Sequence, residues 1–94
     1  MPKLKQYSLD EYINAVESLA SSKGFRIKVF QKTGSAIRFE VYRREEVEIW
    51  DMWVVHTKHN SKRREIWSRD NYKKPDKCLG LDDGTFLKFL EKNN

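Results

Sequence analysis

Three runs of strand-like sequence fill residues 25–56, and the short segments between them constrain the fold more than any other feature. Apolar and polar residues alternate with period two in residues 25–29 and 37–42, and residues 47–56 are rich in aromatic and β-branched side chains. This alternation is typical of half-buried strands. The joining turns, the first of them around Gly34, are too short for the crossover that parallel strands need. The sequence therefore predicts a three-stranded antiparallel sheet.

The third strand has an irregular phase. Its apolar side chains occupy one face up to Ile49 and the opposite face from Trp50 onward. Such a break predicts either a β-bulge near Asp51 or a strand that is covered on both faces. Trp50 and Trp53 fall on opposite sides of the strand, so we expect at least one of them in the core.

A helix is predicted on each side of the sheet segments. The first begins with the capping box Ser8–Glu11, in which each residue can bond the backbone amide of the other. The second follows Asp82, Asp83 and Thr85, which are all candidate N-caps. The predicted architecture is an α+β fold of order α-β-β-β-α, with both helices packed on one face of the sheet. We expect a single domain over residues 1–94.

Residues 57–78 form a basic insertion between the third strand and the last helix. Residues 62–67 fit either a short fourth strand or a helical turn, and residues 71–78 are predicted to be a loop because Pro75 cannot donate to a ladder. Cys78 is the single cysteine, so no internal disulfide is possible. With no apolar run of membrane-spanning length and no secretory signal pattern at the start, we expect a cytoplasmic protein without cofactor, metal or membrane partner.

The whole net charge of the chain lies between His56 and Lys77. This stretch holds eight basic and three acidic side chains, a net charge of +5, which equals the net charge of the 94-residue chain. A concentrated cationic surface on an otherwise neutral body attracts a polyanion such as RNA or DNA. The alternative is a solvated, lysine-rich loop that keeps the protein soluble.

The basic segment supplies two kinds of side chain that nucleic acids contact. Arginine forks and lysine ammonium groups bind phosphates, and aromatic rings stack on unpaired bases. We expect stacking by Trp67 and Tyr72, although Trp67 fits equally well as an anchor to the core. Arg26 and Lys28 point away from Ile27 on the first strand and extend the cationic surface. The expected phosphate contacts come from Lys58, Lys62, Arg63, Arg64, Arg69, Lys73 and Lys74.

Three short segments, in this order, resemble the HicA toxins, small ribonucleases of bacterial toxin–antitoxin systems. They are Ser22–Phe25, Lys32–Ser35 followed by Phe39, and Gly84–Leu90. The resemblance implies a fold like that of double-stranded-RNA-binding domains, and a partner that is RNA in preference to DNA. In the family a catalytic histidine follows the Gly-Ser turn, whereas here Ala36 and Ile37 follow it. The resemblance therefore favours RNA binding over cleavage.

Two alternative functions remain open. His56 and His59 lie beside Lys58, and imidazoles are common acids and bases in ribonucleases. Residues three apart point to opposite faces of a strand, so a turn after His56 is needed to bring the two rings together. A HicA-like, metal-independent ribonuclease using His56 or His59 is the first alternative. The second is a protein-interaction module that binds an acidic protein surface, with Trp50 or Trp53 as its anchor.

Overall fold

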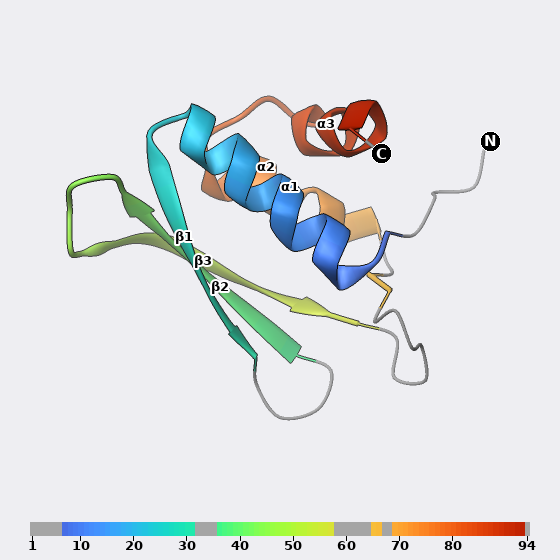
Figure 1. The fold of residues 1–94 in the computed structure, drawn as a ribbon, viewed down its shortest axis with the longest axis horizontal. Helices are drawn as coiled ribbons and strands as arrows, with labels where there is room; N and C mark the ends of the chain where they lie inside the picture. Colours follow the sequence, from blue (N-terminus) through green and yellow to red (C-terminus); the bar gives the residue numbers. More distant parts are fainter. Residues whose placement is uncertain (1–6, 32–35, 58–64, 67–68, 94) are drawn as a thin grey trace.

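The computed structural model describes residues 7–31, 36–57, 65–66 and 69–93. The three strands form one antiparallel sheet in the order β1-β2-β3, with α1 and α3 on one side of it and α2 against β3 (Figure 1). The predicted α+β fold and its helix–strands–helix order are confirmed. In chain order the elements are α1 (Leu9–Ser22), β1 (Phe25–Gln31), β2 (Ala36–Arg43), β3 (Ile49–His56), the 3-10 turn η1 (Arg69–Tyr72), α2 (Lys74–Cys78) and α3 (Thr85–Asn93).

Helix α1 begins at the predicted capping box. The Ser8 hydroxyl accepts from the Glu11 amide at 3.2 Å, and the Glu11 carboxylate accepts from the Ser8 amide at 3.0 Å. These bonds satisfy two donors that a helix start leaves without partners. The helix ends at Ser22, and Gly24, two residues later, has a φ of +83°, in the left-handed region that glycine adopts without strain. None of the helices in the described part of the chain is long and apolar enough to cross a membrane.

The irregular phase of β3 comes from a β-bulge. Val41 of β2 pairs with Asp51, but its neighbour Tyr42 pairs with Ile49, which leaves Trp50 as the extra residue. The predicted bulge near Asp51 is therefore confirmed. The shift turns Trp53 into the core, where it is 5% exposed, and leaves Trp50 49% exposed.

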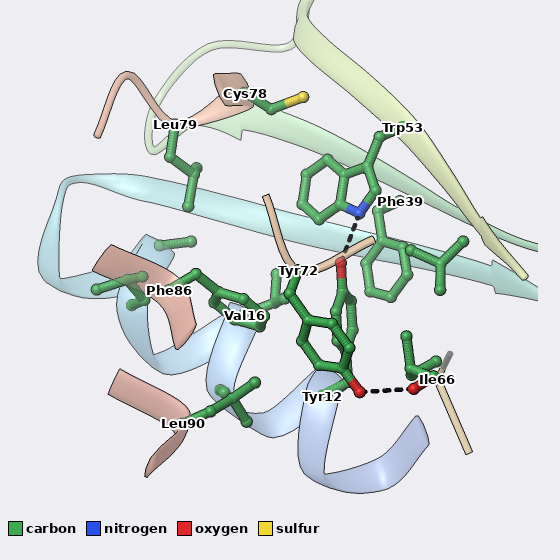
Figure 2. Close-up of a cluster of buried hydrophobic side chains, with 14 of the residues drawn as sticks. Tyr12, Val16, Phe39, Trp53, Ile66, Tyr72, Cys78, Leu79, Phe86 and Leu90 are labelled. Atoms are coloured by element: carbon green, nitrogen blue, oxygen red, sulfur yellow. Dashed lines mark hydrogen bonds between the residues drawn. The ribbon is translucent and has the colours of Figure 1, made fainter. Parts of the chain in front are cut away.

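Tyr12 of α1 lies at the centre of the core, where its side chain contacts the sheet and Tyr72 of η1 (Figure 2). Its ring makes edge contacts with Phe39 at 5.4 Å and Tyr72 at 5.9 Å between ring centroids. Its hydroxyl accepts from the Trp53 indole nitrogen at 3.1 Å and donates to the Asn71 carbonyl at 2.7 Å. Because both polar partners are satisfied, the ring and the indole can be buried without loss of hydrogen bonds.

The segment after residue 68 is helical, so the prediction of a loop over residues 71–78 is wrong. It forms η1 and α2, and Pro75 lies in the first turn of α2. A proline there loses nothing, because the first amides of a helix have no partner inside it. Both elements are too short to produce a readable helical period in the sequence.

The start of α3 is held by a distant carboxylate. Asp76 in α2 accepts from the amides of Gly84 at 2.9 Å and Phe86 at 2.8 Å. The sequence predicts an N-cap at Asp82, Asp83 or Thr85 instead. The Thr85 hydroxyl donates to the Asp82 carbonyl and does not accept from an amide in that bond. Burial raises the pKa of the Asp76 carboxyl, and the two amide bonds act in the opposite direction. Helices α2 and α3 are therefore joined through one buried side chain.

Candidate nucleic-acid interface

The site residues predicted from the sequence fall into two groups. The structure describes His56, Arg69, Tyr72, Lys73 and Lys74. The geometry below therefore concerns these residues and the sheet beside them. The predicted contacts outside the described residues are Lys58, His59, Lys62, Arg63, Arg64 and Trp67.

Tyr72 is not available for base stacking, because its side chain is 1% exposed. Its hydroxyl donates to the Ile66 carbonyl at 2.6 Å and accepts from the Tyr7 amide at 3.0 Å (Figure 2 shows the first of these bonds). Burial is also the main reason that the pKa of this phenol rises to about 12. The prediction that Tyr72 stacks on a base is therefore wrong. Tyr72 is a core residue that holds the described part of the basic segment.

The described cations of residues 69–77 differ in exposure and in their contacts with the sheet. Arg69, Lys73 and Lys77 are exposed, whereas the Lys74 ammonium donates to the Val54 carbonyl of β3 at 2.7 Å. A surface depression beside them is lined by Lys73, Lys74 and Lys77 together with three aspartates. Its charges balance, so the depression alone does not form an anion site. The cationic character belongs to the segment as a whole.

Helix α2 covers the outer edge of β3. Besides the Lys74 bond, the Cys78 thiol lies 3.8 Å from the Met52 carbonyl. Burial raises the pKa of that thiol to about 12, with Asp51 adding to the shift, so Cys78 is protonated at neutral pH and is not a nucleophile. The contacts fix the start and end of the basic segment beside the sheet, where Thr57 also bridges to Ile66.

The second face of the sheet carries a row of cations. Arg26 of β1 pairs with Tyr42 of β2, and their side chains share this face. The Arg26 guanidinium lies 4.8 Å from the Tyr42 ring centroid and the Lys28 ammonium lies 5.0 Å from it. Such contacts hold cations over a ring. The prediction that Arg26 and Lys28 share an outward face is confirmed, and no helix in the described part of the chain covers it (Figure 1).

One carboxylate, that of Glu40, lies on the same face directly opposite Lys28. Glu40 of β2 is 9% exposed, forms an ion pair with Arg38 and accepts from the Tyr42 hydroxyl at 2.5 Å. The hydrogen bond to Glu40 is the main cause of the raised pKa of Tyr42. Arg26, Lys28 and Arg38 are three cations against the one carboxylate of Glu40, so these four residues give the face a net charge of +2.

Apolar side chains occupy the other half of the same face. Ile49, Met52 and Val54 of β3 pair with residues of β2 that point to this face, so their side chains share it. Phe30 of β1 pairs with Arg38 and lies on the same face. Phe30 is 45% exposed, and Ile49 and Met52 are exposed to a similar degree. The sequence reasoning missed Phe30 and this apolar column. The signal was the same period-two alternation that placed Arg26 and Lys28, but grouping residues across strands needs the register.

His56 lies exposed at the end of β3, directly opposite Ala36 in the pairing with β2. Whether it meets His59 is a question that lies outside the described residues. Within the described part of the chain, no cluster of three or more His, Cys, Asp or Glu side chains is suited to a metal ion.

A scan of protein-family models, a search of curated proteins and a search of solved structures found no match to this chain. The resemblance to the HicA toxins stays a prediction from the three motifs.

Proposed function

We propose that the protein binds RNA without cleaving it, through phosphate contacts from its basic segment. The observation that carries this proposal is that the sequence concentrates a net charge of +5 between His56 and Lys77, and that the described end of this segment is held beside β3 of a sheet whose open face carries further cations on β1. Tyr72 and Lys74 fix the described end of the segment against the core and β3, and Arg26 and Lys28 supply a second group of cations on β1. A surface of this kind attracts a polyanion over its whole width.

The basic residues contact phosphates and do not recognise the base sequence of the RNA. Each contact releases a condensed counterion, so affinity falls steeply as salt rises. Arg69 and Lys73 are exposed next to the anchor and belong to this set, together with the predicted contacts at Arg63 and Arg64. Trp67 remains the aromatic residue proposed to stack on an unpaired base.

Replacing Arg63 and Arg64 by alanine is expected to weaken RNA binding and to reduce its salt dependence. If about five phosphates are engaged, wild-type affinity for an RNA hairpin falls roughly 10²–10³-fold between 50 and 200 mM salt. Losing two contacts lowers the slope of log affinity against log salt by about 1.5. Fluorescence polarisation with a labelled hairpin measures both quantities.

The matched control is Lys88→Ala with Lys92→Ala, two exposed lysines of α3 whose removal changes the net charge equally. It is expected to keep the affinity within about twofold, and neither double variant should shift the melting midpoint. An equal loss of affinity in both double variants would show non-specific attraction and contradict the assigned segment.

A second candidate function, a ribonuclease, is favoured by the position of His56. Residue 36 is where the resemblance to the HicA toxins would have a catalytic histidine, and His56 is its cross-strand partner. Directly paired residues on antiparallel strands have Cβ atoms about 5 Å apart. An imidazole at residue 56 can therefore occupy nearly the place that residue 36 would give it, and can take the proton of a ribose hydroxyl.

His56→Ala separates this candidate from simple binding. If the protein cleaves RNA through His56, the variant loses cleavage on a gel while its affinity and melting midpoint stay close to those of the wild type. Lys23→Ala, an exposed residue at the end of α1, is the control that should retain cleavage. Intact RNA after long incubation with the wild type would remove the ribonuclease candidate.

A protein-interaction module is the third candidate, and the turn before β3 favours it. Val47 is 89% exposed, and Ile49 and Trp50 next to it are each nearly half exposed. Aromatic anchors of this kind are enriched at protein interfaces. Absence of RNA binding at 50 mM salt would select this candidate.

A further inference from the structure

We infer that the open face of the sheet binds an unpaired RNA strand, with phosphates over Arg26 and Lys28 of β1 and bases over Phe30 and β3. The inference rests on the proposed function and deepens it, because it names the kind of RNA and a second contact surface. It is carried by the arrangement of side chains on the sheet and not by the basic segment.

The cations of the face stand at one end of β1, and the apolar side chains are Phe30 at the other end of β1 and the column on β3. Arg26 and Lys28 stand on β1, and Ile49, Met52 and Val54 stand two strands away on β3. Strands in a sheet are about 4.8 Å apart, so the two columns are separated by roughly 10 Å. A nucleic-acid strand that crosses the face from Arg26 and Lys28 toward Phe30 and β3 would place phosphates over the cations and bases over the apolar side chains.

The cations of this face are positioned before any ligand arrives. Arg26 and Lys28 both lie within about 5 Å of the Tyr42 ring centroid, and Arg38 is ion-paired with Glu40. Side chains that are already ordered lose less freedom on binding than free lysines do. The face therefore suits phosphate contact better than an equal number of mobile surface lysines.

The apolar half of the face distinguishes an unpaired strand from a duplex. In a duplex the faces of the bases are stacked inside, and the surface presents phosphates, sugars and base edges. Phe30 and Met52 gain contact area only against base faces that are not already stacked. A purely duplex-binding surface would have no use for partly exposed apolar side chains between its cations.

The charge of this face suits the phosphates of a nucleic-acid strand. Arg38 and Glu40 neutralise each other, so the excess positive charge of these residues is that of Arg26 and Lys28. The described end of the basic segment lies at the β3 edge of the sheet, since Lys74 reaches the backbone of Val54. One strand of RNA can therefore contact the segment and the sheet together.

Phe30→Ala tests the inference. The probe is a labelled RNA strand of about 12 nucleotides without self-pairing, compared with the same sequence in duplex form. The variant is expected to bind the single strand roughly 5- to 100-fold more weakly and the duplex with less than a twofold change. Phe30→Trp should retain single-strand binding, because it retains a ring, whereas Phe30→Leu should lose most of it.

Val47→Ala is the matched control, since Val47 is also exposed but lies in the turn before β3 and not on the open face. It should bind both probes as the wild type does. Circular dichroism of each variant at the assay temperature establishes that the sheet is intact.

The outcomes separate this inference from the function on which it rests. Unchanged single-strand binding by Phe30→Ala, or an equal loss for strand and duplex, overturns the inference and leaves RNA binding by the segment in place. Unchanged single-strand binding by Phe30→Ala would instead favour a protein partner for this face. Tighter binding of the matching DNA strand than of the RNA strand overturns the assignment to RNA. Failure of the wild type to bind either RNA probe at 50 mM salt contradicts the proposed function itself.

Discussion

Tyr72→Phe is expected to lower the free energy of unfolding by about 2–4 kcal/mol. The variant keeps the buried ring but removes the hydroxyl that donates to the Ile66 carbonyl and accepts from the Tyr7 amide. Each buried backbone group left without a partner costs about 1–3 kcal/mol. Urea unfolding followed by circular dichroism measures the change, with an unchanged m-value as the sign that the folded state is otherwise the same.

Tyr42→Phe is the matched control for Tyr72→Phe. It removes the same atom, but Tyr42 lies on the open face and its hydroxyl bonds a side chain, Glu40, and not the backbone. The unfolding midpoint of this variant should stay close to that of the wild type. Equal loss of stability in the two variants would show that the Tyr72 hydroxyl has no special part in holding the basic segment.

The elements that the sequence predicts correctly are those whose signals are local. The capping box of Ser8 and Glu11 lies within one helical turn, and the alternation in β1 and β2 is set by neighbouring residues. The bulge at Trp50 is visible as a break in the same alternation. Each of these features depends on residues within a few positions, so no knowledge of distant contacts is needed.

The features that the sequence does not reveal depend on contacts across the fold. Tyr72 stands among lysines and arginines and has the composition of an exposed stacking residue, yet Ile66 and Tyr7 supply partners that permit its burial. Pro75 suggests a loop unless the start of α2 is known. The grouping of Phe30 with Arg38 requires the register of β1 on β2.

Asp76→Ala is expected to destabilise the protein by about 2–4 kcal/mol at neutral pH. The carboxylate accepts from two amides at the start of α3, and its removal leaves both without partners in a site where Asp76 is 2% exposed. Loss of a cap costs about 0.5–2 kcal/mol, and an unpaired buried amide adds to this. Asp82→Ala, an exposed neighbour, is the control and should change stability by less than about 0.5 kcal/mol.

The charge of Asp76 also sets the direction of a pH effect on stability. Burial raises the pKa of the folded carboxyl above its unfolded value near 3.8, so the folded state binds the proton more tightly than the unfolded state. Stability from this group is therefore greatest below the unfolded pKa and declines as the pH rises through the folded pKa.

The variant Asp76→Asn tests this pH effect, because it keeps one acceptor oxygen and cannot ionise. Its unfolding free energy, measured in urea from pH 4 to 7, should lie between those of the wild type and Asp76→Ala at neutral pH. It should also lack the part of the decline with pH that comes from this carboxyl. An identical pH profile for the wild type and Asp76→Asn would contradict a raised pKa at Asp76, and the cap would then act as a fully ionised carboxylate.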